Sequence, residues 1–304
     1  MIIIPPDHAV IKDSIEKHLA SKKKDVITVS WITDFDGTVY KLQSGTPEDP
    51  ENRSWLCMSI QLAGFEGIAS TNPEFMQQTC YAPYLRATEV NEGGRTFHAT
   101  IAANLDTLEE GCAKQIAYDW ACLKRNILGF PLTTAFEGLV DGSNVPPSSV
   151  ICYRPEESIY VCPDSEKVTV VYALSYPDPN DMEIAKVFLE EFSVARRMKE
   201  LQSSPIASFQ TLPPGELAAY KIVPSDATVG YLSLTFEKRH VATPEKLNKA
   251  TDMLLSVRSY LHYHIKCCKG YMHTRMRYRV KELLKVLNRA DPTKAAEGGR
   301  IGRQ

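Results

Sequence analysis

The residues with the clearest chemical potential are the two aspartates of Asp34-Phe35-Asp36-Gly37-Thr38, which follow a run of strand-forming residues. An Asp-x-Asp-Gly-Thr sequence after a β-strand suits phosphoryl transfer. The first aspartate can attack phosphorus, the second can handle the leaving-group proton, and Mg²⁺ can neutralise the developing charge. This is the one enzymatic hypothesis that the sequence raises, with Asp34 as nucleophile.

The same five residues also have a structural explanation. The motif is the nucleophile signature of the haloacid dehalogenase-like phosphatases, in which it follows a central parallel strand buried on both faces. Here the apolar and polar residues of Ile27–Trp31 alternate, which is typical of a strand with one exposed face. Asp36-Gly37 between two strand-like runs is typical of a hairpin turn, where glycine supplies a positive φ. The later acidic pair that Mg²⁺ needs is not found behind a strand, because Asp178 and Asp181 lie in a proline-interrupted loop. We therefore interpret the motif as a turn and keep the Mg²⁺-dependent phosphatase as the alternative.

Histidine and cysteine side chains gather near the C-terminus at His262, His264, Cys267, Cys268 and His273. At helical spacing His264 shares a face with the two cysteines, whereas His262 points elsewhere and His273 lies more than two turns further on. A tetrahedral zinc site would need a fourth ligand from another segment. We interpret the cluster as packing at a helix interface. No nucleotide-binding fingerprint stands out, and we predict no catalytic residue, no cofactor and no metal.

The composition is that of a soluble globular protein. The chain has 304 residues, of which 43% are hydrophobic and 24% charged, with a formal net charge of −2. This balance argues against nucleic acid as a partner. Eight cysteines without Cys-x-x-Cys spacing, and an N-terminus unlike a signal peptide, predict a cytoplasmic protein with reduced thiols. No apolar run approaches the length of a membrane span.

One order of elements is predicted twice: three strands, a helix, a fourth strand and a second helix. The predicted strands are Val26–Ile32, Thr38–Leu42, Trp55–Leu62 and Thr96–Ala102 in the first half, and Val150–Tyr153, Ser158–Cys162, Lys167–Leu174 and Gly230–Phe236 in the second. The predicted helices are Asp7–Ala20, Pro73–Cys80, a segment from a capping Asp106 to Asn126, Asp181–Leu201 and a final helix from Thr243. Apolar and polar residues alternate in several strands, as in antiparallel sheets. The predicted fold class is α+β, with two similar sandwich-like α/β domains of mainly antiparallel sheets and helices, followed by a long C-terminal helix.

The predicted domain boundaries follow from one loop and from the start and the end of the final helix. Residues 141–149, rich in Gly, Ser, Asn and Pro, are the predicted linker. A first α/β domain is therefore expected at residues 1–140 and a second at 150–242. The long helix is expected at 243–290 and a flexible tail at 291–304.

The final helix is the feature that most needs explanation. Thr243 can cap it, Pro244 suits its first turn, and Pro292 prevents its continuation beyond Ala290. About 45 residues at 1.5 Å each span roughly 68 Å, whereas a domain of about 150 residues is only some 40 Å across. The helix is therefore expected to extend past the body that carries it.

One side of this helix is apolar and its distal part is basic. An exposed apolar stripe on a helix needs something to cover it, so we predict a coiled-coil-like interface with a partner protein rather than nucleic acid. The predicted interface residues are Leu254, Leu261, Ile265, Cys268, Met272, Met276, Leu283 and Leu287. Among the basic residues, Arg275, Arg277 and Lys281 are candidates for contact with an acidic surface.

Three segments of this helix resemble a known family. Tyr260–Cys267, His273–Arg277 and Leu284–Ala290 closely resemble the C-terminal signature of subunit 2, the 34-kilodalton subunit, of the actin-related protein 2/3 complex. The resemblance continues backwards in family order through Gly230-Tyr231, Val187-Phe188, Tyr160-Val161, Leu123–Asn126 and Asp34–Gly37. It covers most of the chain from residue 34 to residue 290, and residues 64–95 match poorly.

The resemblance implies two similar α/β domains and a long helix that pairs with a helix of the 20-kilodalton subunit 4. It also implies a non-enzymatic scaffold in the actin cytoskeleton. Such a scaffold holds the two actin-related proteins, contacts the mother filament, and supports actin filament nucleation and branching. In this picture the partner helix covers the apolar stripe, and Arg275, Arg277 and Lys281 meet acidic filament or subunit surfaces.

Overall fold

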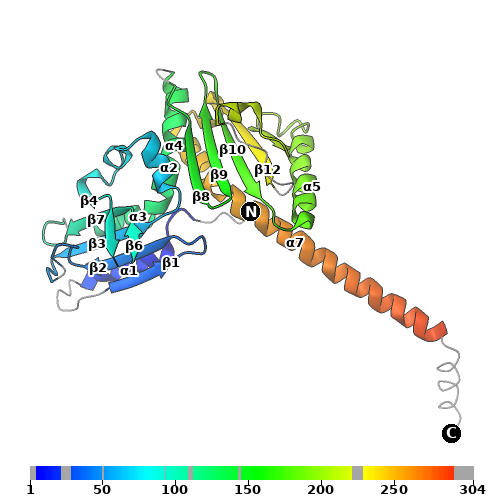
Figure 1. Ribbon diagram of the computed structural model, residues 1–304, viewed down its shortest axis with the longest axis horizontal. Coiled ribbons are helices and arrows are strands. Elements are labelled where there is room, and N and C mark those ends of the chain that lie inside the picture. Colours follow the sequence, from blue (N-terminus) through cyan, green and yellow to red (C-terminus); the bar gives the residue numbers. More distant parts are fainter. Residues whose placement is uncertain are drawn as a thin grey trace, which may run out of the picture. The chain divides into compact units, whose positions relative to one another are not determined.

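The computed structural model describes residues 5–21, 29–49, 51–92, 94–108, 112–142, 145–220 and 229–290. The chain divides into two compact units, the first ending at Val257 and the second beginning at Arg258. All described strands belong to the first unit (Figure 1). One uninterrupted helix, α7 (Pro244–Ala290), begins in the first unit and makes up the described part of the second. The predicted tail at 291–304 lies outside the described residues.

The first sheet has five strands in the order β1-β2-β3-β7-β4 and every pair is antiparallel. Its strands are β1 (Val29–Thr33), β2 (Val39–Ser44), β3 (Trp55–Gln61), β4 (Leu85–Ala87) and β7 (Ala99–Asn104). A separate two-stranded ribbon is formed by β5 (Val90–Glu92) and β6 (Arg95–Phe97). The strand predicted from Val26 is described only from Val29 onwards.

The second sheet repeats the topology of the first. Its strands, in the order β8-β9-β10-β12-β11, are β8 (Ser149–Arg154), β9 (Glu157–Pro163), β10 (Lys167–Ser175), β12 (Val229–Glu237) and β11 (Ile206–Gln210). In both sheets three consecutive strands form a meander and the last strand in sequence pairs with the third. The remaining strand lies beyond that last strand, at the sheet edge. The predicted fold class, with its internal repetition, is confirmed, whereas the domain boundaries at 140, 149 and 242 stay predictions.

The described helices of the first unit that precede α7 have between 4 and 19 residues. They are α1 (Ala9–Ser21), α2 (Phe65–Thr71), α3 (Ala113–Ala121), α4 (Leu123–Asp141), α5 (Pro179–Ala195) and α6 (Lys238–Val241), with 3₁₀ turns at Phe75–Gln78, Ala82–Tyr84 and Gly215–Tyr220. Asp178 is the N-cap of α5, and its side chain accepts a hydrogen bond from the Asn180 N–H at 2.9 Å. The helix predicted over Asp181–Leu201 therefore begins earlier, and it ends earlier as well, at Ala195.

The prediction of one helix from Asp106 to Asn126 is wrong at its first residue, and it stops before the helical region ends. The side-chain oxygen of Asn104 accepts a hydrogen bond from the Asp106 backbone N–H at 2.9 Å, so Asp106 lies in a turn after β7. The first described helix after it is α3, which begins at Ala113. It is followed almost directly by α4, of which only Leu123–Asn126 falls within the predicted helix.

Helix α4 is nearly surrounded by protein. Nine of its 19 residues are buried, among them Gly129 and Pro131. A helix buried on most sides lacks the apolar and polar faces that reveal a surface helix, and an internal proline argues against helix in a sequence. From α4, Phe136 packs its ring on Phe236 of the second sheet, with 5.2 Å between ring centroids.

Helix α2 packs closely on the backbone of β8 at Gly67. A methyl group on Gly67 would lie 2.5 Å from the carbonyl oxygen of Val150, which is too close for any side chain. Glycine at this position therefore lets the helix approach the strand without an intervening side chain.

Gly67→Ala is expected to lower the free energy of unfolding by about 1–3 kcal/mol, because the helix must move away from β8. Chemical denaturation of the full chain measures this change. Gly270→Ala is the matched control, since a methyl group there meets nothing within 4 Å and alanine favours a helix interior over glycine. Equal stability of the Gly67→Ala variant and the wild type would contradict the close packing.

Candidate subunit interface on the final helix

The first turns of α7 are fixed by hydrogen bonds inside the first unit. Thr243 caps the helix, accepting from the Lys246 N–H at 3.3 Å. The Tyr172 hydroxyl of β10 donates to the Leu254 carbonyl at 2.7 Å. The Arg125 Nε of α4 donates to the Asp252 carboxylate at 2.7 Å. The predicted cap is confirmed, and the helix leaves a well-anchored base.

The predicted apolar stripe changes its environment at one point along α7. Leu254, Leu261 and Ile265 are 0%, 2% and 1% exposed in the chain alone. Beyond them the stripe is exposed. We call the residues Cys268, Met272, Met276, Leu283 and Leu287 the distal stripe; Met276, Leu283 and Leu287 are 62%, 58% and 57% exposed.

This change divides the eight predicted interface residues into two groups. The side chains of Leu254, Leu261 and Ile265 are buried in the chain alone. A large part of each side chain of Met272, Met276, Leu283 and Leu287 meets solvent, and Cys268 is exposed as well. The surface that a partner can reach therefore begins after Ile265, and interface roles for the predicted residues stay predictions.

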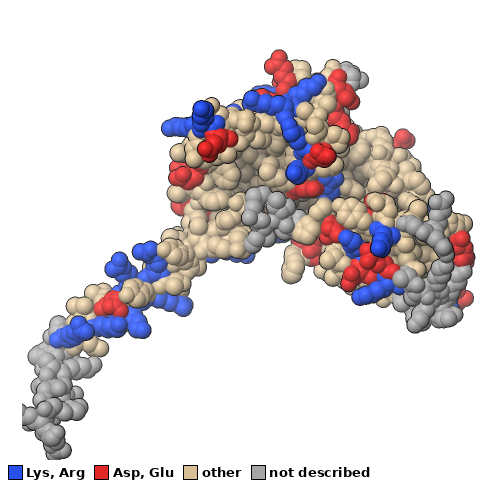
Figure 2. All heavy atoms as spheres, turned by 180° about the vertical axis from the view of Figure 1, so that it is seen from behind, with Lys and Arg blue, Asp and Glu red and all other residues tan. Residues whose placement is uncertain are grey.

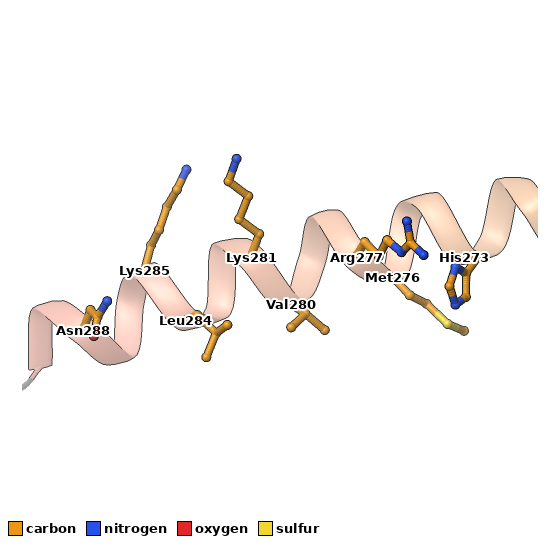
Figure 3. Close-up of a pocket in the computed structure, with 8 residues that line it drawn as sticks. All are labelled: His273, Met276, Arg277, Val280, Lys281, Leu284, Lys285 and Asn288. Carbon is orange, nitrogen blue, oxygen red and sulfur yellow. The ribbon is translucent and has the colours of Figure 1, made fainter.

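The basic residues of the distal helix lie mostly away from the distal stripe. From Lys266 to Ala290 the sequence has eight Lys and Arg residues against one glutamate, and blue side chains dominate this part of Figure 2. Lys281 and Lys285 point to one side of α7, whereas Val280 points to the other (Figure 3). With 100° per residue, Arg277 and Lys281 lie about 125° and about 165° from the centre of the distal stripe.

Arg275 differs from Arg277 and Lys281 in its surroundings. It lies about 75° from the centre of the distal stripe. Its Nη1 donates to the Tyr271 hydroxyl at 2.8 Å, and its guanidinium lies 5.6 Å from the centroid of that ring. Arg275 is therefore held at the border of the stripe, while Arg277 and Lys281 face elsewhere.

A shallow groove runs between these two kinds of side chain. Its lining residues are His273, Met276, Arg277, Val280, Lys281, Leu284, Lys285 and Asn288 (Figure 3). All of them come from α7, so the groove is the surface of one helix and has no opposite wall. It offers apolar contact on one side and positive charge on the other, which suits a second polypeptide better than a small molecule.

The Asp34–Thr38 segment forms the turn between β1 and β2, as predicted. The two strands pair antiparallel, with Thr33 opposite Val39, and Gly37 has a φ of 88°. The Asp34 N–H donates to the Thr38 carbonyl at 2.8 Å, which closes the turn. β1 is at the edge of an antiparallel sheet, unlike the buried parallel strand of the phosphatase arrangement.

Both aspartates of the turn are bonded to a single lysine from α4. Lys124 Nζ lies 2.6 Å from Asp34 Oδ2 and 2.5 Å from Asp36 Oδ2. Burial raises the pKa of the Asp36 carboxyl, but the hydrogen bond and charge of Lys124, with the bonds from Thr38, outweigh it and leave that pKa below its ordinary value. This arrangement pins the turn to α4 and leaves Asp34 paired with a cation.

The histidine and cysteine cluster does not form a metal site within the described ranges. No group of three or more His, Cys, Asp or Glu side chains with metal-binding geometry occurs among the described residues. His264 packs against the Tyr260 ring at 4.2 Å between centroids, while Cys267 and His273 are exposed on α7. Among the same described residues, no helix is both long and apolar enough to cross a membrane.

The structural roles of Leu123-Lys124-Arg125-Asn126 were not predicted from the sequence. Lys124 holds the turn, Arg125 holds the base of α7, and Asn126 donates to the Tyr81 hydroxyl at 2.9 Å. The partners of Lys124 and Arg125 are 90 and 127 residues away in sequence. Only the family resemblance marked this block, because no local pattern reveals such distant pairs.

Replacing Lys124 by methionine is expected to lower the free energy of unfolding by about 1–3 kcal/mol near neutral pH, because two carboxylates lose a charged donor. The folded pKa of Asp36 is depressed, so its share of this stability is complete above the unfolded pKa of about 3.9 and is lost as the pH falls through the folded pKa. Urea unfolding at a series of pH values measures the difference between wild type and variant.

That difference should shrink below about pH 4. Lys114→Met, which removes an exposed lysine from α3, is the control and should leave stability nearly unchanged. A difference between wild type and Lys124→Met that is constant down to acidic pH would contradict the ion pair with Asp36.

Comparisons with known proteins agree with the resemblance seen in the sequence. The model of one protein family, described as "Arp2/3 complex, 34 kD subunit p34-Arc", matches residues 58–294. A protein of Dictyostelium discoideum named "Actin-related protein 2/3 complex subunit 2" is 30% identical over 294 residues, covering 96% of this chain and 94% of its own length. A protein of Schizosaccharomyces pombe with the same name is 29% identical over 279 residues, covering 86% of this chain and 85% of its own length.

The family model matches well over half of the chain, and the Dictyostelium relative is similar over nearly all of it. The chain therefore belongs to the p34-Arc family, the family of the 34 kD subunit of the Arp2/3 complex.

Proposed function

We propose that this chain is a non-enzymatic scaffold subunit of an Arp2/3 complex in the cytoplasmic actin cytoskeleton. A helix of a sister subunit, the 20-kilodalton subunit 4, covers the distal stripe. One observation carries the proposal: the stripe is buried as far as Ile265 and exposed from Cys268 onwards. The names of the two relatives support membership of the complex.

The distal stripe has the properties of a helix-pairing surface. Its five residues are spaced by four or seven positions, so they share one side of α7. Burying each large apolar side chain of the stripe under a partner contributes about 1.5–3 kcal/mol to the free energy of association. A second helix is the simplest element that could follow the stripe from Cys268 to Leu287, over about 20 residues or roughly 30 Å.

The basic residues Arg277 and Lys281 are proposed to meet an acidic surface of the actin filament or of another subunit. They face away from the distal stripe, so a helix that covers the stripe leaves them accessible. Arg275 is the third candidate, but its contact with Tyr271 at the stripe border favours a role beside the partner helix. Through these contacts the subunit would help to hold the actin-related proteins and to support filament nucleation and branching.

The phosphatase alternative has little support from the geometry. Asp34 is bonded to Lys124 at 2.6 Å and lies in a hairpin turn at a sheet edge. A nucleophilic aspartate needs a free lone pair facing the phosphorus and a nearby Mg²⁺ site. The turn has a structural function instead, which the Lys124 ion pairs explain.

The helix-pairing proposal is tested by placing a charge in the distal stripe. Met276→Asp and Leu283→Asp are each expected to abolish co-purification of the tagged chain with a partner of roughly 20 kilodaltons, because a buried unpaired carboxylate costs several kcal/mol. Affinity purification from the organism's own cells, followed by mass spectrometry, measures the partners retained.

Tyr278→Asp is the matched control. Tyr278 is as exposed as Met276, but it lies about 135° from the centre of the distal stripe. The control should retain the partner and the actin-related proteins. Normal assembly of both stripe variants, or equal loss in the Tyr278→Asp variant, would contradict the proposal.

The basic-face proposal is tested after assembly. A complex containing Arg277→Glu and Lys281→Glu should assemble normally but co-sediment less with actin filaments, because two attractive charges become repulsive. The wild-type affinity should also fall as salt is raised, as expected for exposed charges. Unchanged co-sedimentation of the double variant at low salt would exclude these residues from the contact.

A further inference from the structure

The apolar positions of α7 follow an 11-residue repeat. Steps of three, four and four residues, repeated from Leu254, meet an apolar residue at nearly every position. The positions are Leu254, Val257, Leu261, Ile265, Cys268, Met272, Met276, Arg279, Leu283, Leu287 and Ala290. The single charged residue in this series is Arg279.

An 11-residue repeat corresponds to about 3.67 residues per turn, slightly more than the 3.6 of a straight helix. A helix that follows such a stripe lies almost parallel to α7 with a slight right-handed twist. The repeat is the same up to Ile265, where Leu254, Leu261 and Ile265 are buried and Val257 is half-buried, and in the exposed distal stripe. The distal stripe thus continues a packing surface that is already covered at its beginning.

Arg279 lies within the distal stripe and not beside it. It is about 35° from the centre of the stripe, closer than Val280, which lies about 65° away on the other side. Its neighbours three positions before and four after are Met276 and Leu283, both of which belong to the stripe. Any helix that covers these two residues must also cover the side chain of Arg279.

The distal helix holds little counter-charge of its own. Glu282 carries the single carboxylate between Lys266 and Ala290, and that carboxylate is bonded to Lys285 at 2.8 Å. A guanidinium removed from water without a counter-charge is strongly unfavourable. A polar residue at one core position of a helix pair is also a known means of fixing the register of the two helices.

We propose that Arg279 determines the register of the helix pair by binding a carboxylate on the facing side of the partner helix. The inference rests on the proposed function, since it assumes a partner helix on the distal stripe. It adds the chemistry of that partner: an acidic helix with an 11-residue apolar repeat, in which one Asp or Glu takes the position opposite Arg279. The surrounding basic residues of α7 favour further acidic residues along its edges.

The test compares Arg279→Leu with Arg277→Leu in the complex formed by the full chain and the sister subunit that co-purifies with it. Both variants replace an exposed arginine of the same helix with leucine, which is a good helix former. Arg277 lies about 125° from the centre of the distal stripe and next to Thr274 and Lys281. Circular dichroism verifies that both variants keep the helix content of the wild type.

Arg279→Leu is expected to weaken pairing at least about tenfold, because the partner carboxylate is left buried without a charged partner. Arg277→Leu should stay within about threefold of the wild type, and so should Arg279→Lys, which keeps the positive charge. Neutralising each acidic residue of the partner helix in turn should identify one whose effect is lost in the Arg279→Leu background, as a double-mutant cycle requires.

Two failures can be told apart. If the wild-type chain binds no helical sister subunit, both this inference and the proposed function are wrong. If the wild type binds its sister subunit but Arg279→Leu binds as well as Arg277→Leu or better, only the inference about Arg279 is overturned.

Discussion

The structure depends on one constraint: the chain can bury only part of the apolar side of α7. As far as Ile265 that side is buried, and from Cys268 onwards it is exposed. An exposed apolar stripe over several turns is unfavourable in water, and a long helix without tertiary contacts has marginal stability of its own. The membership of the p34-Arc family agrees with this constraint, since it links the chain to a multi-subunit complex.

The base of α7 must be held firmly if its distal part is to offer a defined surface. Helix α4 supplies much of that support, because it contacts the turn of the first sheet, a strand of the second sheet and the first turns of α7. Lys124 contacts the turn, Phe136 contacts the strand, and Arg125 contacts α7. The Asp34-Phe35-Asp36 motif belongs to this support, where its two carboxylates bind one lysine.

Sequence patterns predicted the elements whose two sides differ. The alternating strands and the final helix are of this kind. The Asp36-Gly37 turn was predicted for another reason, because glycine readily takes a positive φ. Most of helix α4 was not predicted, because its buried surroundings remove the difference between its sides. The short edge strands β4 and β11 were not predicted, because their patterns are brief. The distal stripe is exposed on α7, and its role as an interface stays a prediction. Sequence could not reveal that Leu261 and Ile265 are buried within the chain, since burial depends on contacts that only the folded structure supplies.

The most direct test of the account is hydrogen–deuterium exchange of the backbone amides from Cys268 to Leu287, compared between the isolated chain and the complex purified from cells. In the isolated chain these amides should exchange quickly, whereas those between Leu247 and Ile265 should be protected. In the complex the amides along the distal stripe should become as strongly protected as the base of the helix. Equal and rapid exchange of the distal amides in both samples would contradict the claim that a partner covers this helix.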